Sequence, residues 1–386
     1  MRKFDKIKNS LFQLKDLSTI GAADIGGNVI SAVFWFYMAA MLDVKDYGEI
    51  AYLLSIASIA SSVSMTGASN TLMVYTAKNI KIQSAVYTIS LSAAAITSVV
   101  VFLIFHNFGI SLYIIGAVIF GLASAEILGS KKYLSYSRFL VTQKILMVVF
   151  SIVLYYLIGI EGIIIGIALG YFHYLIRIYE GFKNSKIAFG TLKSKFGFMM
   201  NSFILNLANA FSGSFDKIII APILGFTLLG NYQLGIQVLS VLLILPNIAL
   251  KYMLPQEASG NPNIKLKTLV ILISVLLTGC GIFLSPIIIP ALFAKYTDAV
   301  QIIQILSLSL IPMSIIITYQ SKFLSMEKSN VILISAAIYL ATQITLIVIL
   351  GKIYGVNGMA SAFVLAVIVE CLFYIGVNKY VKLQPN

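Results

Sequence analysis

Long apolar runs separated by short polar segments repeat along the whole chain. Each run holds roughly 20 or more residues with few charges, the length that an α-helix needs to cross about 30 Å of hydrocarbon. Such continuous runs differ from the short alternating segments of a β-barrel. We therefore predict an all-α polytopic membrane protein with about twelve transmembrane helices. The runs are residues 20–42, 47–76, 83–106, 109–130, 139–160, 162–181, 198–224, 230–254, 267–293, 299–324, 330–350 and 355–378.

Composition supports the same class. Hydrophobic residues make up 59% of the chain and charged residues 11%, and the mean hydropathy is +0.96. These values exclude a soluble domain. The polar opening segment before the first run is expected to be an interfacial amphipathic helix rather than a cleavable signal peptide.

The basic residues give an orientation. Of the 27 lysines and arginines, 22 fall in ends and loops on one side of the predicted membrane, and only Lys45, Lys295 and Lys352 fall in loops on the other. By the positive-inside rule, the rich side is cytoplasmic. We expect a multi-pass protein of the cell (inner or plasma) membrane with both termini in the cytoplasm. The net charge of +13 is thus a topology signal, and nucleic acid is not an expected partner.

A polar stripe lies within the seventh apolar run. Its members recur at steps of four, three, four and three, so they share one narrow face of a helix. Shifting back 185 positions finds most of the stripe again on the first run. We interpret this as an internal duplication in which the first helix of each half turns a polar face towards a shared cavity. The stripe is Ser202, Asn206, Asn209, Gly213 and Asp216, and its earlier copy is Leu17, Gly21, Asp24, Asn28 and Ser31.

A second repeat closes each half. Residues 159–162 (GIEG) open the sixth predicted helix as residues 355–358 (GVNG) open the twelfth. Six crossings return the chain to the same side, so the repeats are parallel and related by a pseudo-two-fold axis along the membrane normal. A basic linker lies near the middle of the chain. We therefore predict two six-helix lobes, residues 1–190 with the cytoplasmic amino-terminal segment, and residues 191–386.

Three segments resemble a known family. They are MLDVKDYGEIAYLLSIASIASSVSMTGAS (41–69), DKIIIAPILGFTLLGNYQLGIQVLSVLLILPNIALKYMLPQ (216–256) and YGVNGMASAF (354–363). They are similar to Wzx-type polysaccharide (O-antigen) flippases of the multidrug/oligosaccharidyl-lipid/polysaccharide exporter superfamily. The resemblance implies two lobes around a central cavity that moves a polyprenyl-diphosphate-linked oligosaccharide from the inner to the outer leaflet. It also implies the lipid bilayer and other membrane proteins of polysaccharide assembly as partners.

Charged and amide side chains inside the apolar runs are the candidate site. A glycan diphosphate needs polar and cationic partners to replace lost water, and intramembrane charges are functional candidates by default. Packing, helix pairing and topology anchoring are the alternative roles of these residues, and Glu126 with Lys144 is interpreted as a structural ion pair. The expected substrate-binding residues are Lys217, Arg177, Lys144, Asn206, Asn209 and Asn28, and the expected coupling or gating residues are Glu370, Asp216 and Asp24.

Two other function classes stay open. A cation-coupled drug or small-molecule antiporter of the same superfamily would share the fold and the repeats. A membrane enzyme of polysaccharide assembly is disfavoured because no large loop carries paired carboxylates or arginines. The absence of a GxxxxGK[ST] motif argues against direct ATP hydrolysis. We expect a transporter rather than an enzyme, with no cofactor or metal and with H⁺ or Na⁺ as the coupling cation.

Overall fold

The computed structural model describes residues 2–185, 187, 189–258, 263–326 and 328–383. All regular secondary structure within these residues is α-helical, as predicted. The chain forms two compact units, one of Met1–Phe34 with Leu53–Ala210, the other of Trp35–Tyr52 with Phe211–Asn386. Three helices contribute to both units: α1 (Arg2–Met41), α2 (Val44–Ser64) and α10 (Phe196–Leu224). The predicted division of the lobes between residues 190 and 191 stays a prediction.

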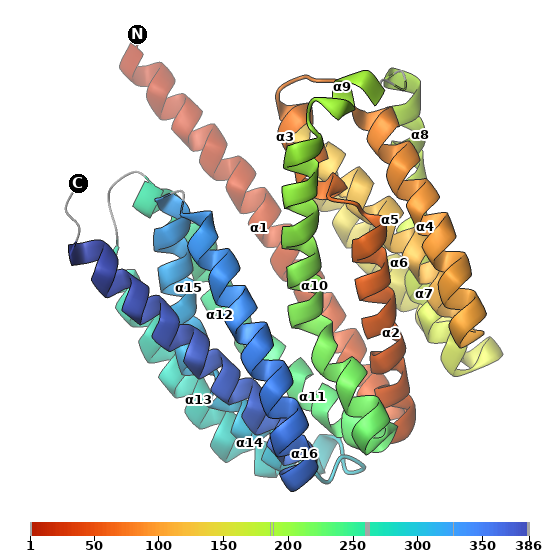
Figure 1. Ribbon diagram of the computed structural model, residues 1–386, viewed down its shortest axis with the longest axis vertical. Helices are drawn as coiled ribbons and strands as arrows, with labels where there is room; N and C mark the ends of the chain where they lie inside the picture. Colours follow the sequence, from red (N-terminus) through yellow and green to blue (C-terminus); the bar gives the residue numbers. More distant parts are fainter. Residues whose placement is uncertain (1, 186, 188, 259–262, 327, 384–386) are drawn as a thin grey trace. The chain divides into compact units, whose positions relative to one another are not determined.

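Unit 1 is built around α5. This helix packs against α3, α4, α6, α7 and α8, and α6 pairs along its length with α7 (Figure 1). Ile114, Val118 and Leu122 of α5 are fully buried, so this helix supplies side chains to the core of the unit. The remaining helices of the unit are α3 (Ala68–Ala77), α4 (Gln83–Phe105), α5 (Phe108–Gly129), α6 (Tyr133–Ile158), α7 (Ile160–Phe172), α8 (Leu175–Asn184) and α9 (Phe189–Lys193).

Unit 2 holds the second set of helices. In it, α14 packs against α11, α13 and α16, while α15 packs against α12, α13 and α16 (Figure 1). Its core gathers buried apolar residues from α10, α11, α14, α15 and α16. The helices are α11 (Phe226–Leu242), α12 (Ile244–Ala258), α13 (Ile264–Leu292), α14 (Ala299–Ser307), α15 (Leu310–Ser325) and α16 (Ser329–Leu383).

Two glycines bring α2 and α11 together inside unit 2. A Cβ atom on Gly48 would lie 2.0 Å from the carbonyl oxygen of Phe226, and one on Gly230 would lie 2.0 Å from that of Val44. The contact is reciprocal: Gly48 packs on the carbonyl of Phe226, four residues before Gly230, and Gly230 packs on the carbonyl of Val44, four residues before Gly48. Only glycine permits this separation, and the crossing attaches the start of α2 to unit 2.

The membrane-spanning helices agree with the predicted fold class. Within the described residues, seven helices are long and apolar enough to cross a membrane, or up to ten if each of three bent pairs is one span. The long α16 breaks at Gly355 (φ 59°, ψ −139°) and so holds two of the predicted spans. The 40-residue α1 contains the first apolar run. The chain described here is thus an all-α polytopic membrane protein.

Several predicted spans are bent rather than straight. The run 47–76 divides into α2 and α3 at 47°, 230–254 into α11 and α12 at 45°, and 299–324 into α14 and α15 at 40°. The first break has a clear local cause: Thr66 (φ 49°) and Gly67 (φ 78°) both adopt left-handed backbone, which ends a right-handed helix.

Candidate functional site

A buried charge cluster lies at the centre of unit 2. Asp216 and Lys217 of α10 are only 3% and 8% exposed. Asp216 accepts hydrogen bonds from the Lys217 backbone N–H (2.8 Å), from Lys217 Nζ (3.3 Å) and from the Tyr232 hydroxyl of α11 (2.8 Å). Lys217 Nζ also donates to the Gly213 carbonyl at 2.9 Å. Both charges are therefore paired and hydrogen-bonded, as burial demands.

The cluster extends towards Glu370 of α16. Tyr339 is 8% exposed and interacts electrostatically with both Asp216 and Glu370. Ser335 lies close to Glu370, and its hydroxyl is 2.8 Å from that of Tyr374. Within unit 2, the hydroxyls of Tyr232 and Tyr339 thus lie near Asp216, and Tyr339 is also near Glu370, the second carboxylate that the sequence assigns to coupling. Hydroxyls of this kind can donate or accept, so they can follow a change of charge on either carboxylate.

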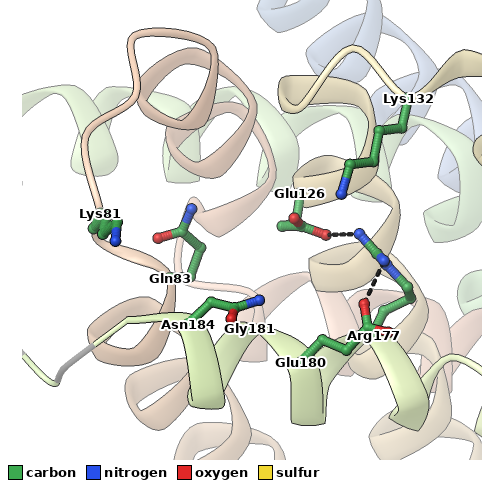
Figure 2. Close-up of a pocket in the computed structure, with 8 residues that line it drawn as sticks. All are labelled: Lys81, Gln83, Glu126, Lys132, Arg177, Glu180, Gly181 and Asn184. Carbon is green, nitrogen blue, oxygen red and sulfur yellow. Dashed lines mark hydrogen bonds and ion pairs between the residues drawn. The ribbon is translucent and has the colours of Figure 1, made fainter.

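Arg177 lies in a second charge cluster, inside unit 1. Its Nη2 is 2.9 Å from Glu126 Oε2 and its Nη1 pairs with Glu180. Glu126 also accepts from the Ser130 hydroxyl at 3.0 Å. The prediction that Glu126 pairs with Lys144 is therefore wrong. The carboxylate instead pairs with Arg177 of α8, and the stem of Lys144 packs beside Gly27 of α1. Arg177, Glu126 and Glu180 line a cavity of about 270 Å³ (Figure 2).

The first and sixth helices bring three predicted site residues to one part of unit 1. Asp24 Oδ1 accepts from the Tyr136 hydroxyl at 3.1 Å. The alkyl stem of Lys144 packs over Gly27, where a Cβ would lie 3.5 Å from Lys144 Cγ. Asn28, the next residue, is exposed. Asp24, Asn28 and Lys144 thus occupy the interface of α1 and α6 or its margin.

The polar stripe of α10 is not uniform. Asn209 and Gly213 are exposed and Asn206 is partly buried, whereas Ser202 at one end and Asp216 at the other are buried. The stripe passes from unit 1 to unit 2 after Ala210. The water-filled cavity expected in front of it stays a prediction.

Some residues of these clusters escaped the sequence reasoning. Tyr232 lies 185 positions after Tyr47, the offset of the duplication, but nothing in the pattern pairs its hydroxyl with Asp216. Glu180 lies three residues after Arg177, which is the spacing for an ion pair on one helix face, so that contact was available from the sequence. Tyr136 and Tyr339 lie far along the chain from their carboxylate partners.

No protein-family model matches the sequence, and no curated protein does. Solved structures share its fold. An inward-facing multidrug resistance MATE family transporter of the MOP superfamily aligns with a TM-score of 0.73 at 12% identity, covering 93% of this chain and 96% of its own. The lipid II flippase MurJ, in an inward closed conformation, aligns with a TM-score of 0.75 at 16% identity, covering 93% and 87%. A MATE transporter of Vibrio cholerae gives 0.61 at 13% identity over 96% and 97%. The chain thus has the fold of these membrane transporters over nearly its whole length.

Proposed function

We propose that the chain is a Wzx-type flippase that moves a polyprenyl-diphosphate-linked oligosaccharide, such as an O-antigen or capsule repeat unit, from the inner to the outer leaflet. Transport proceeds by alternating access in the cell membrane, with both termini in the cytoplasm. The shared fold with a lipid II flippase supports the proposal, as does the resemblance of residues 41–69, 216–256 and 354–363 to polysaccharide flippases. Other membrane proteins of polysaccharide assembly are the expected partners.

One observation carries the proposal: each unit holds a largely buried basic side chain that is paired with carboxylates. Lys217 is held by Asp216, and Arg177 by Glu126 and Glu180. A diphosphate offers the same kind of oxygen acceptors as these carboxylates. The carboxylate partners keep the cations balanced at rest, and the substrate's phosphate oxygens replace them during transport. Lys144 adds positive potential, and the amides of Asn206, Asn209 and Asn28 bind sugar hydroxyls.

The gene deletion tests this proposal. Cells without the gene should accumulate one lipid-linked glycan on the cytoplasmic face of the membrane, and the wild-type gene should clear it. The variant that carries Arg177→Gln, Lys217→Gln and Lys144→Gln together should leave the glycan in place, and its amount in the membrane is measured alongside, because Asp216 and Glu126 lose their cations. Full complementation by this triple variant would refute the cationic role of these residues.

A cation-coupled drug or small-molecule antiporter is the second candidate. The tyrosine hydroxyls near Asp216 and Glu370 favour it, because carboxylates with hydroxyl neighbours can take up H⁺ or Na⁺. Under the flippase proposal the same carboxylates, with Asp24, couple or gate the conformational change. In proteoliposomes, Glu370→Gln should leave glycolipid binding intact and alter the dependence of transport on pH or sodium. Drug efflux driven by a cation gradient, without any glycolipid movement, would favour the antiporter.

A further inference from the structure

The cavity beside Arg177 has a lining with an excess of positive charge. Its basic residues are Lys81, Lys132 and Arg177, and its carboxylates are Glu126 and Glu180. Figure 2 shows the Lys132 ammonium pointing towards Glu126 and Arg177, with Lys81 on the opposite side of the cavity. Lys81 and Lys132 are exposed, so neither needs a protein partner. The lining therefore carries one positive charge that its carboxylates do not balance and that an anionic ligand can neutralise.

One of the three guanidinium nitrogens of Arg177 has no hydrogen-bond partner among the described residues. Its side chain is 11% exposed, and Nη1 and Nη2 are taken by Glu180 and Glu126. Within the described part of the chain, no acceptor lies within hydrogen-bond distance of the buried Nε. A buried N–H without a partner is unfavourable, so an oxygen ligand entering the cavity would satisfy it.

The position of α8 relates this cavity to the membrane. Leu175, Ile176 and Tyr179 are 45%, 61% and 70% exposed, and at 100° per residue they form one apolar face. Arg177, Glu180 and Asn184 lie on the adjacent face and line the cavity. An exposed apolar face on a helix of this protein is suited to lipid. The cavity therefore borders lipid, at the end of unit 1 where the basic loops predict cytoplasm.

Lys81 and Lys132 lie just before two helices that are long and apolar enough to cross a membrane. Lys81 precedes α4, and Lys132 precedes α6. Long basic side chains at the ends of such helices extend to the headgroup region. The three cations thus surround a space that a headgroup of the adjacent leaflet can enter.

We propose that this cavity binds the phosphate group of an anionic membrane lipid. The phosphate oxygens accept from Arg177 Nε and from the ammonium groups of Lys81 and Lys132, while Glu126 holds the guanidinium in place. Arg177 is shared with the proposed substrate site, whereas Lys81 and Lys132 are not, so the inference rests on the adjacent leaflet, which a flippase and a drug antiporter would both meet.

Lipid retention by the purified full-length protein tests the proposal. Native mass spectrometry of detergent-solubilised protein should show retained phosphatidic acid and much less phosphatidylcholine. The variant Lys81→Gln/Lys132→Gln should retain phosphatidic acid about 10-fold more weakly or worse, since each cation near a lipid surface contributes an appreciable attraction. Lys183→Gln is the matched control, because Lys183 lies exposed on the outer face of α8, and it should retain the lipid as the wild type does. Equal retention by wild type and double variant, or an equal loss in the control, would overturn the proposal.

Two further experiments distinguish a membrane lipid from free phosphate as the ligand and test the electrostatic basis of binding. Inorganic phosphate should displace the lipid only at millimolar concentrations; saturable binding of phosphate without lipid retention would assign the cavity to the free ion instead. Glu126→Gln removes a repelling negative charge but keeps an amide oxygen that can accept from the Arg177 guanidinium, so it should tighten phosphatidic acid retention several-fold. Weaker retention by a Glu126→Gln protein that unfolds at the wild-type temperature would contradict the electrostatic argument.

Discussion

At the scale of single residues, Asp216 shows how a charge is tolerated inside a membrane-spanning helix. Three donors reach its two oxygens, two of them from Lys217 and one from Tyr232. Two of these donors come from its own neighbour in sequence, so the pair is largely satisfied before any other helix arrives. The Tyr232 hydroxyl then ties α11 to α10 through the remaining oxygen.

The duplicated tyrosines provide a matched pair of substitutions. Tyr232→Phe removes the donor to Asp216 Oδ2 and should lower the free energy of unfolding by about 1–3 kcal/mol. Tyr47 is equally buried, but its hydroxyl has no hydrogen-bond partner among the described residues. Tyr47→Phe should therefore be neutral or slightly stabilising. Thermal unfolding of the purified variants in one detergent measures both, and equal losses would contradict the assignment.

The sequence located the charged residues inside the apolar runs, but it did not predict all of their partners. Asp216, Lys217, Arg177 and Glu370 stand out because charge within an apolar run is rare. The partner of Arg177 was missed, because Glu126 lies 51 residues away and could be reached only by packing α5 against α8. Contacts across helices depend on helix rotation, which a hydrophobic pattern fixes only approximately.

At the scale of helices, the crossing of α2 and α11 depends on two glycines. Gly48→Ala or Gly230→Ala would place a Cβ about 2 Å from a backbone carbonyl oxygen, which only a shift of a whole helix can relieve. Each should lower the unfolding free energy by about 3 kcal/mol or prevent assembly of unit 2. Gly279→Ala in α13 is the control, because its added Cβ meets nothing within 4 Å. It should be neutral or stabilising, since alanine favours helix. Thermal unfolding and membrane yield report both, and a tolerated Gly230→Leu would disprove the close crossing.

The hydrophobic pattern located the helices but not their bends. A run of apolar residues has the same composition whether the helix is straight or broken, so 47–76 was predicted as one span. The break at Thr66 and Gly67 depends on left-handed backbone at two positions, and glycine allows this without requiring it. The bend between α14 and α15 lies at Leu308 and Ser309, and Pro312 gives it a local cause, because proline has no N–H to donate to the Leu308 carbonyl and its ring clashes with that carbonyl.

At the scale of the whole molecule, the ends of unit 2 agree with the predicted alternation of loops. Lys295 Nζ is 2.9 Å from Asp43 Oδ1, which places the loop after α13 at the same end as the loop after α1. Both were predicted to lie outside. Tags after Asn386 and between Lys183 and Lys195 should report cytoplasm, while tags near Asp46 and Lys295 should report the outside. Fusions to reporters active on one side only provide the measurement. A cytoplasmic signal at Lys295 would reject the twelve-helix topology.

The Asp216–Lys217 pair allows folding and transport to be separated. Lys217→Gln alone leaves a buried carboxylate without its cation and should lower the unfolding free energy by about 3 kcal/mol or more. The double variant Asp216→Asn/Lys217→Gln removes both charges, so most of that stability should return. If Lys217 binds the substrate's diphosphate, the double variant should fold yet still fail to clear the lipid-linked glycan.

Two further variants test whether positive charge at this pair promotes binding of the lipid-linked glycan. Lys217→Arg keeps the charge and should retain substantial transport if positive potential is what the diphosphate needs, because guanidinium also binds phosphate oxygens. Asp216→Asn alone leaves Lys217 as an unbalanced cation, so it should be less stable but bind the lipid-linked glycan at least as tightly, most visibly at low salt where attraction is least screened. Glycolipid binding to the purified variants and clearance of the glycan in cells are the two readouts. Wild-type transport by the stable Asp216→Asn/Lys217→Gln variant would leave the pair with a structural role and exclude Lys217 from substrate binding.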